Sequence, residues 1–474
     1  MSILNKTKTI VTIGPSSKDI EVIKQLIQNG TDVFRLDLSN SDRLFCNEII
    51  DKIDEANEKL GTNVSILFDI LGPTISVGEL LTSHVFLKKD DTVRIYMDKI
   101  VGDSTKFSVS YPNLINDVRI GSIIKLSFGI IELEVIDKED DYILCNVNKE
   151  GVLTENTYIN VPSTKLNMPF LSEKDKDDIK YASSKNIDFI ALSFVSTLED
   201  VLEVNDLLIE LENDHIGIIS KIENEQSLDN LNEIINASDG ILIDRGDLGI
   251  EIPLERVPGI QKMVINKCNM LGKISIVATE MISSMENSLM PTRAEVSDIA
   301  NAVLQGCDAV MLTDETTIGK YPIETLKMME KIIRESEMGV DYLELMDKAS
   351  RNENKDITGI IAHSVIDGAN RINADAIITP TNSGYTAKKI SRFRPPCPIL
   401  AVSPNKDVVK NLNLYYGVIP RIIKNFDSLD KMIKESKNIS IEVFNLKEKD
   451  KIIITGGYPF KEVKNTNFMK IEEL

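Results

Sequence analysis

The sequence lacks the features of membrane, secreted and nucleic-acid-binding proteins. No apolar run reaches the roughly 18 residues that a membrane-spanning helix needs. The N-terminal segment MSILNKTKTI has neither the apolar stretch nor the small-residue cleavage site of a signal peptide. The formal net charge is -20, and no cluster of Lys and Arg with interleaved aromatics offsets it, so we expect no binding to nucleic acid or to anionic membranes. We therefore expect a cytoplasmic protein.

Cysteine is scarce, and its spacing does not fit a metal site. The five cysteines are odd in number, far apart and outside any C-x-x-C pattern. We interpret them as free buried thiols in a reducing compartment and expect no zinc site. Apolar residues make up 42% of the chain and charged residues 27%, which is typical of a globular protein. A length of 474 residues favours two or three domains.

Short apolar runs rich in β-branched residues alternate with segments of helical period. Such runs are typical of buried parallel strands joined by crossover helices. The predicted strands are residues 9–13, 32–36, 64–68, 189–192, 216–220, 240–243, 274–278 and 309–312. The clearest predicted helices are residues 19–29, 172–184, 227–237 and 292–305. Eight strand units, without a Gly-rich dinucleotide fingerprint after the first strand, indicate an α/β protein built on a (β/α)8 (TIM) barrel.

Two long segments depart from the barrel pattern. Between residues 72 and 165, short alternating strands with turn signals predict an inserted all-β domain, which would lie over the barrel mouth as a lid. A second α/β series follows, with strands near 376–379, 399–402 and 451–455. We therefore predict a catalytic barrel of residues 1–71 and 166–338, a β lid of residues 72–165, and a C-terminal α/β domain of regulatory type at residues 339–474.

Polar side chains follow the predicted strands where each one ends, and the ends of barrel strands share one mouth. These side chains are Thr12, Arg35, Asp37, Asp69, Ser193, Lys221, Glu223, Asp244, Arg245, Asp247, Thr279, Glu280, Thr313, Asp314 and Glu315. Lys221, Glu223 and Asp247 place two carboxylates and a cation on adjacent strands. Magnesium suits this group because it prefers oxygen ligands, and His and Cys are absent from the mouth. The segment RGDLG also offers flexible backbone N–H groups for a substrate carboxylate.

Specific motifs extend over nearly the whole chain in a fixed order. They include TKTIVTIGPSS, FRLDLSN, FDILGPTIS, MPFLSEKDKDDI, IDFIALSFV, KIENEQSLDNLNEII, SDGILIDRGDLGIEIP, GKISIVATEMISSM, PTRAEVSDIANAV and DAVMLTDET. In this order they resemble the pyruvate kinase family, of which the chain is identified as a divergent member. The resemblance implies phosphoryl transfer from phosphoenolpyruvate to ADP by a homotetramer. It also implies Mg²⁺ or Mn²⁺ and often a monovalent cation.

Roles for single residues follow from the resemblance position by position. It implies that Glu223 and Asp247 hold the metal, and that Lys221 stabilises the transferring phosphoryl group and the enolate oxygen. It also implies a role for Thr279 in delivering the proton to the enolate carbon. The remaining residues that it implies are Ser193, Gly246, Asp247 and Thr279 for substrate, Arg35 for phosphate, Thr12 and Arg35 for nucleotide, and Thr381, Ser383, Gly384 and Thr386 for an effector phosphate.

The monovalent cation site departs from the family pattern. The resemblance equates its four ligands with Asp37, Ser39, Asp69 and Ile70. Ile70 has no side-chain oxygen, so we do not expect potassium dependence in its usual form.

The phosphate-binding positions depart as well. The family's Lys and phosphate-gripping Arg after the third strand are replaced by Leu71 and Ser76. The charge also changes at four other mouth positions, which are Asp37, Thr74, Asp244 and Asp314. Together these changes make the mouth about four charges more negative than the family pattern, which opposes binding of anionic substrates. In the lid, the family's Asp-Asp-Gly reads Ser127-Phe128-Gly129.

Three functions remain open from the sequence. The first is a pyruvate kinase or a close phosphotransferase. The second is another reaction on the same enolate site, such as decarboxylation of oxaloacetate or phosphorylation of a different hydroxy acid. The third is a non-catalytic paralogue that binds a metabolite or a partner. Asp244 and Asp314 add a further alternative, a second divalent ion that replaces the missing Arg.

Overall fold

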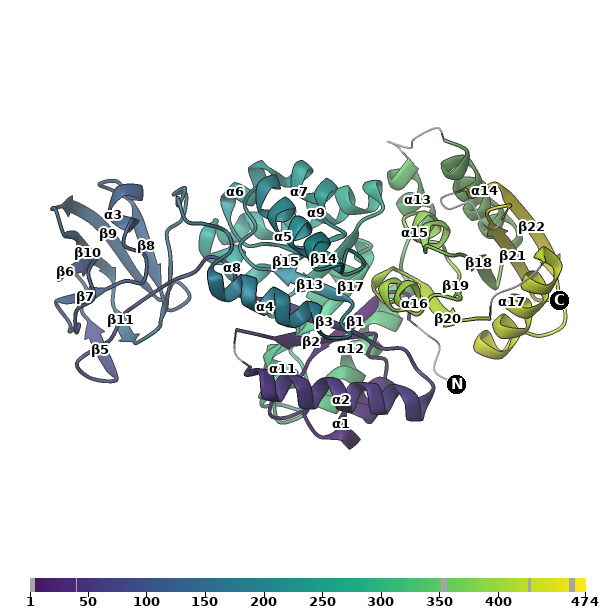
Figure 1. Ribbon diagram of the computed structural model, residues 1–474, viewed down its shortest axis with the longest axis horizontal. Helices are drawn as coiled ribbons and strands as arrows, with labels where there is room; N and C mark the ends of the chain where they lie inside the picture. The colour runs from purple at the N-terminus through teal and green to yellow at the C-terminus, as the bar shows by residue number, and fades with distance from the viewer. Residues whose placement is uncertain (1–4, 40, 351–355, 425–427, 460–464) are drawn as a thin grey trace.

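The computed structural model describes residues 5–39, 41–350, 356–424, 428–459 and 465–474. The chain forms three lobes in a row, and Figure 1 shows the barrel in the centre with the β insertion and the C-terminal domain on opposite sides of it. The predicted fold class, a barrel with an inserted β domain and a C-terminal α/β domain, is confirmed. The residues at which we divided the chain into domains stay a prediction.

Eight parallel strands close the barrel. Each is a short run of mostly buried apolar residues, as a strand covered on both faces requires. They are β1 (Lys8–Thr12), β2 (Val33–Asp37), β3 (Ser65–Ile70), β13 (Phe189–Leu192), β14 (Gly217–Ile222), β15 (Gly240–Asp244), β16 (Ile274–Ala278) and β17 (Ala309–Leu312). The strand order around the barrel is β1-β17-β16-β15-β14-β13-β3-β2. All eight predicted strands are therefore confirmed, with ends that differ by at most two residues.

Helices surround the barrel, and hydroxyl side chains start several of them. The helices are α1 (Ile20–Gln28), α2 (Arg43–Leu60), α4 (Glu173–Ser183), α5 (Leu198–Glu210), α6 (Glu225–Asp229), α7 (Leu231–Ala237), α8 (Arg245–Glu251), α9 (Val257–Leu271), α10 (Arg293–Leu304), α11 (Asp314–Thr317) and α12 (Pro322–Glu337). Ser172 and Thr292 cap α4 and α10 in capping boxes, which fixes the two starts that we predicted. The prediction of one helix over 227–237 is wrong. Asn230 leaves helical geometry between α6 and α7, and its amide donates to the Ser196 carbonyl at 2.8 Å.

The insertion is a β domain with its own core. Its strands are β4 (Ile75–Ser76), β5 (His84–Leu87), β6 (Thr92–Tyr96), β7 (Lys106–Ser108), β8 (Ile123–Leu126), β9 (Ile131–Lys138), β10 (Tyr142–Lys149), β11 (Gly151–Thr154) and β12 (Tyr158–Asn160). Seven of them form one sheet, and β11 pairs with β5. Alternate side chains of β9 and β10 are buried, as a sheet with one covered face requires. One helical turn, α3 (Leu114–Asp117), is the exception to the predicted all-β content.

The C-terminal domain is a five-stranded sheet with helices. Its helices are α13 (Tyr342–Ser350), α14 (Ile357–Ile372), α15 (Tyr385–Ser391), α16 (Lys406–Asn411) and α17 (Leu429–Phe444), and its strands in sheet order are β20 (Val418–Ile422), β19 (Ile399–Ser403), β18 (Ala376–Pro380), β21 (Lys451–Gly456) and β22 (Phe468–Glu473). The three predicted strands are confirmed, whereas β20 and β22 were missed. Both are edge strands: Pro420 interrupts the pattern of β20, and half of the residues of β22 are charged.

Two other predictions from composition are tested by the structure. All five cysteines are free and buried, as we expected. Within the described ranges, no helix is both long enough and apolar enough to cross a membrane.

A buried ion pair joins the C-terminal domain to the barrel at the N-terminal ends of the strands. Arg394 donates to Asp308 at 2.6 Å, and the two side chains are only 2% and 1% exposed. Asp308 directly precedes β17, and it also accepts from the backbone N–H of Ser275 at 3.0 Å and of Tyr416 at 3.1 Å. Inward-facing barrel residues and residues of the C-terminal domain share one apolar cluster around this contact. The barrel mouth is left at the opposite end.

Replacing Arg394 should destabilise the protein. Arg394→Met removes the counter-charge and leaves the Asp308 carboxylate buried and uncompensated, which costs about 3 to 5 kcal/mol. Urea unfolding followed by circular dichroism measures the loss, because the chain has no Trp for fluorescence. Arg371→Met is the matched control, since Arg371 is 77% exposed in its pair with Asp367, and it should change stability by less than about 0.5 kcal/mol. Equal effects of the two substitutions would refute the proposed role of the interface.

Candidate active site

A deep cavity lies at the C-terminal ends of the barrel strands, under the lid. Its volume is about 1320 Å³, which exceeds that of an ordinary small-ligand pocket and leaves room for two substrates. Charged side chains line the barrel side of the cavity, and residues from β12 and the segment after it line the lid side. The charged lining residues of the barrel include Arg35, Asp37, Asp69, Lys221, Glu223, Asp244 and Asp247. The predicted convergence of strand ends is therefore found for most of the residues that we named.

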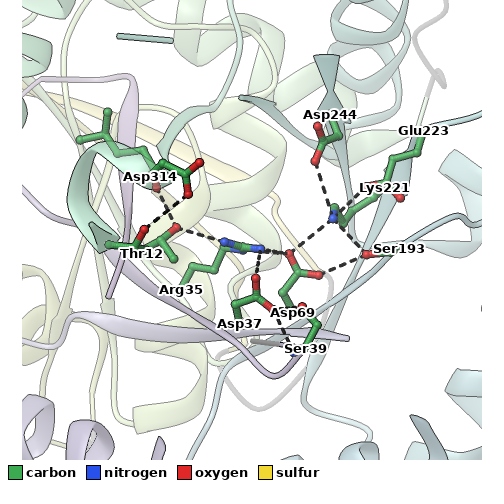
Figure 2. A network of polar contacts seen from close by, with 12 residues as sticks. Thr12, Arg35, Asp37, Ser39, Asp69, Ser193, Lys221, Glu223, Asp244 and Asp314 are labelled. Atoms are coloured by element: carbon green, nitrogen blue, oxygen red, sulfur yellow. Dashed lines mark hydrogen bonds and ion pairs between the residues drawn. The ribbon is translucent and has the colours of Figure 1, made fainter. Parts of the chain in front are cut away.

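Lys221 is the buried centre of this group (Figure 2). Its Nζ lies 2.8 Å from Glu223 Oε1, 3.5 Å from Asp69 Oδ2 and 3.6 Å from Asp244 Oδ2. It also donates to Ser193 Oγ at 3.0 Å. Burial opposes the charged form of Lys221, but the surrounding carboxylates raise its pKa well above the usual value. The ammonium group is therefore charged and held in one position.

The same crowding of negative charge favours the charged form of Lys221 but disfavours the charged forms of the carboxylates. Burial raises the pKa of Glu223 to about 8, and the negative charges of Asp247 and Asp244 add to this effect. Burial and the charge of Asp244 raise the pKa of Asp247 to about 6. The protein alone thus supplies more negative charge here than its cations compensate.

Arg35 forms the second polar centre, on β2 (Figure 2). Its Nε donates to Asp69 Oδ2 at 2.8 Å, its Nη2 to Asp37 Oδ2 at 3.2 Å and its Nη1 to Thr12 Oγ1 at 3.3 Å. The Asp37 carboxylate also accepts from the Ser39 backbone N–H at 2.9 Å. The guanidinium therefore lies between Asp37 and Asp69, two of the residues that the resemblance equates with monovalent cation ligands.

Three carboxylates in the mouth can hold a metal ion. One oxygen from each of Glu223, Asp244 and Asp247 lies within 4.8 Å of the other two. Asp244 Oδ1 is buried and has no hydrogen-bond partner among the residues that the structure describes. An oxygen-only donor set with an unsatisfied buried oxygen fits Mg²⁺ or Mn²⁺, so the residues present are compatible with the metal that the sequence indicates. We predicted Glu223 and Asp247 as its ligands, whereas we considered Asp244, the last residue of β15, only as a change of charge and as part of an alternative second-ion site with Asp314.

Thr279 is held close to the metal-binding segment by backbone contacts. Its Oγ1 accepts from the Gly246 N–H at 2.9 Å and donates to the Ala278 carbonyl at 2.7 Å. The φ angle of Thr279 is 62°, which is strained for a β-branched residue. Arg245 stabilises this conformation by donating to the Thr279 carbonyl. The RGDLG segment is helical, in α8, so the predicted flexible backbone is wrong, and Gly246 N–H is already engaged.

Polar contacts fix the lid above the mouth. Lys125 Nζ donates to the Ile250 carbonyl at 2.5 Å, and Asn160 Nδ2 donates to Glu251 Oε1 at 3.0 Å. Ser163 Oγ donates to Glu225 Oε2 at 2.7 Å. No motif in the sequence indicates these contacts, because each joins residues that are at least 62 positions apart in the chain.

Several predicted positions lie outside the central group. Glu315 is 1% exposed and accepts from the backbone N–H of Ile282 and Thr313, so its role is structural. Arg245 forms an ion pair with Asp298 and does not line the cavity. The predicted effector loop lies in the C-terminal domain between β18 and α15, and its residue Thr386 is buried against Thr466. The effector role stays a prediction.

Comparison with known proteins identifies the family. The family model "Pyruvate kinase, barrel domain" matches residues 4–326, and "Pyruvate kinase, alpha/beta domain" matches residues 360–472. A pyruvate kinase from Geobacillus stearothermophilus is 41% identical over 98% of this chain and 80% of its own length. One from Staphylococcus saprophyticus is 40% identical over 99% of this chain and 80% of its own length.

The fold comparison agrees. The crystal structure of a pyruvate kinase from Cryptosporidium parvum has a TM-score of 0.94 and 34% identity, and the match covers 99% of this chain and 96% of that one. Since both family models, the sequence identity and the three-part fold extend over nearly the whole chain, this protein belongs to the pyruvate kinase family of phosphotransferases.

Proposed function

We propose that this chain transfers the phosphoryl group of phosphoenolpyruvate to ADP, giving pyruvate and ATP, with Mg²⁺ or Mn²⁺ as the required ion. One observation carries the proposal: a charged Lys221 is buried beside three metal-competent carboxylates, in a cavity large enough for two substrates. Enolate chemistry needs a fixed cation where negative charge develops, in a site from which the lid excludes water.

The metal site is assigned to this chain's own carboxylates. Glu223 and Asp247 would hold the divalent ion, and their raised pKa values are consistent with a site that needs a cation for charge balance. When bound, the ion supplies Lewis-acid stabilisation of the enolate and phosphoryl oxygens.

Lys221 and its neighbours position the reacting groups. The ion pair with Glu223 and the hydrogen bond to Ser193 fix the ammonium group, so that it stabilises charge on the enolate oxygen without reorganisation. Thr279 is fixed through Gly246 and Ala278, and we assign its hydroxyl a part in moving the proton to the enolate carbon. We also assign Ser193, which lines the cavity, and Gly246, which bonds to Thr279, to substrate binding.

The phosphate and nucleotide side is assigned to Arg35 and Thr12. Arg35 is already bonded to Asp69 and Asp37, so its charge is partly neutralised. Ser76 and Leu71 offer no cation in place of the Lys and Arg of the family pattern. We therefore infer weak binding of phosphoenolpyruvate compared with a site that retains those cations.

Further properties follow the family pattern. We propose a cytoplasmic homotetramer without a membrane or nucleic-acid partner, in which Thr381, Ser383, Gly384 and Thr386 form a regulatory anion site. We also propose a barrel of residues 1–71 and 166–338, a lid of 72–165 and a regulatory domain of 339–474. The strands β4 to β12 all fall within the proposed lid, which supports that division.

A second candidate function uses the enolate site alone. The engagement of Arg35 by two carboxylates favours it, because Lys221 and the metal residues could still serve a reaction that needs no phosphate grip, such as decarboxylation of oxaloacetate. A coupled assay with phosphoenolpyruvate, ADP and Mg²⁺ decides between the two. Turnover supports the kinase, and its absence together with oxaloacetate decarboxylation supports the alternative. Absence of both activities supports a non-catalytic relative.

Removal of the central ammonium group should abolish catalysis. Lys221→Ala is expected to lower kcat by at least about 100-fold, because it removes a preorganised charge from the transition state. The circular dichroism spectrum should remain that of the wild type, since the barrel core does not depend on a residue of the mouth. Lys348→Ala on α13 is the control, because Lys348 forms an ion pair with its exposed helix neighbour Glu344 and is far from the mouth in the sequence. Undiminished turnover in Lys221→Ala would remove this residue from the mechanism.

Potassium should have little effect on the rate. Ile70 offers no side-chain oxygen, and the Arg35 guanidinium already bridges Asp37 and Asp69. Replacement of potassium by tetramethylammonium at constant ionic strength should therefore change kcat/KM by less than about twofold. A loss of about tenfold would mean that a monovalent cation binds in the mouth despite these side chains.

Restoring cations near the phosphate side should improve substrate binding. Leu71 lines the cavity, and Ser76 on β4 pairs with Tyr158, which also lines it. Each added cation offers charge-assisted hydrogen bonds worth about 1.5 to 3 kcal/mol. The double variant Leu71→Lys, Ser76→Arg should therefore lower KM for phosphoenolpyruvate by about tenfold or more. Leu71→Gln with Ser76→Gln is the control for side-chain size, and equal KM values in the two double variants would contradict the electrostatic explanation.

A further inference from the structure

Asp244 is a buried carboxylate that makes no helix cap. It precedes the first residue of α8, where an Asp side chain commonly accepts from a backbone N–H of the first turn. Its side chain makes no such bond. The Gly246 N–H donates instead to Thr279 Oγ1 at 2.9 Å. The carboxylate is thereby left free to turn into the mouth, and it lies in the cavity lining.

One oxygen of Asp244 has no partner within the described part of the chain. Asp244 is 5% exposed, and its Oδ1 is buried without a hydrogen bond. Its other oxygen, Oδ2, lies 3.6 Å from Lys221 Nζ, beyond ordinary hydrogen-bond length, whereas Glu223 lies only 2.8 Å from the same ammonium group. A buried polar oxygen without a partner is costly, so its presence points to a ligand that completes the site.

The charges around Asp244 specify the sign of that ligand. Five carboxylates, from Asp37, Asp69, Glu223, Asp244 and Asp247, surround the two cations Arg35 and Lys221. Arg35 is engaged with Asp37 and Asp69, and it makes no ion pair with Asp244. The ligand that Asp244 lacks is therefore a cation.

We propose that Asp244 is a third carboxylate ligand of the divalent-cation site, so that Glu223, Asp244 and Asp247 together bind Mg²⁺ or Mn²⁺ before either substrate arrives. The proposal deepens the proposed function and takes its metal site from it. Mg²⁺ usually takes one or two carboxylates and completes its shell with water and substrate oxygens. A third carboxylate raises the affinity of the substrate-free protein for the ion, because it adds a full negative charge at ligand distance.

The spacing of the three residues is compatible with one ion. Their nearest oxygens lie within 4.8 Å of one another, and oxygens on opposite sides of an octahedral Mg²⁺ are about 4 Å apart. Side-chain rotation is sufficient to close the difference. Asp314, the other acidic departure in the mouth, does not belong to this group among the described residues. The proposal therefore assigns Asp244 to the site of Glu223 and Asp247, and a second ion between Asp244 and Asp314 stays a separate prediction.

Binding of Mn²⁺ to the substrate-free protein tests the proposal. Free Mn²⁺ is measured by electron paramagnetic resonance during titration of the protein without phosphoenolpyruvate or nucleotide. Asp244→Asn keeps the size of the side chain and removes its charge, and it should raise the Kd for Mn²⁺ by about tenfold or more. Asp244→Ala removes the carboxylate without introducing an amide, and it should raise the Kd for Mn²⁺ by the same factor. Glu223→Gln removes another ligand of the proposed site, so the Mn²⁺ that this variant still binds measures non-specific binding to an acidic protein.

Asp314→Asn is the matched control, because it removes one negative charge from the same mouth outside the three ligands. Its Kd should stay within about twofold of the wild type. Thermal unfolding with and without Mn²⁺ gives a second readout: the ion should raise the melting temperature of the wild type and of Asp314→Asn more than that of Asp244→Asn.

Two results would overturn the proposal. One is a Kd of Asp244→Asn and Asp244→Ala within about twofold of the wild type, which would make Asp244 only a counter-charge for Lys221. The other is an equal loss in Asp244→Asn and Asp314→Asn, which would show a general effect of mouth charge. Mn²⁺ binding does not depend on turnover. An inactive protein that binds Mn²⁺ through Asp244 would therefore refute the proposed function and leave this inference intact.

Discussion

The balance of charge around Lys221 is the constraint on which the mouth of this barrel depends. A buried ammonium group is stable only beside carboxylates, and Glu223 provides the direct partner at 2.8 Å. The carboxylates around Lys221 also repel one another, and burial together with this repulsion raises the pKa of Asp247 and Glu223 above their usual values. A divalent cation relieves the repulsion without removing the counter-charges of Lys221. The same arrangement of carboxylates therefore fixes the Lys221 ammonium group and supplies the oxygens that could hold a divalent cation.

The rest of the fold separates stability from chemistry at the two ends of the barrel. At the N-terminal ends of the strands, the Arg394–Asp308 pair and a shared apolar cluster join the C-terminal domain to the barrel. At the C-terminal ends, the lid contacts the barrel through polar groups, such as Asn160 with Glu251. Apolar packing fixes one end permanently, whereas hydrogen bonds over a wide cavity permit substrates to enter and leave at the other.

The departures from the family pattern have different consequences in the structure. Asp37 pairs with Arg35, so the added negative charge there is compensated within the protein. Asp244 has an oxygen that no protein group satisfies, and its charge acts on the metal-binding carboxylates. Summed charge alone treats these changes as equal. Their neighbours decide whether a new carboxylate weakens anion binding or strengthens cation binding.

The sequence by itself determined the parts of this protein that depend on neighbouring residues in the chain. Apolar β-branched runs specified all eight barrel strands, the Ser172 and Thr292 caps specified two helix starts, and the motifs specified the family. The motifs also predicted Lys221, Glu223 and Asp247 as site residues, and these side chains lie together in the mouth. We did not predict the edge strands β20 and β22, because they contain Pro420 and polar residues. Pairing at a sheet edge tolerates such residues, whereas the pattern of a buried strand excludes them. Only the tertiary structure decided that Arg35 bridges Asp37 and Asp69, that Arg245 turns away to Asp298, and that Asp244 faces Glu223 and Asp247 with an unpaired oxygen. These facts depend on where side chains from separate strands point, and the direction of a side chain is set by the surrounding packing, which no local stretch of sequence contains.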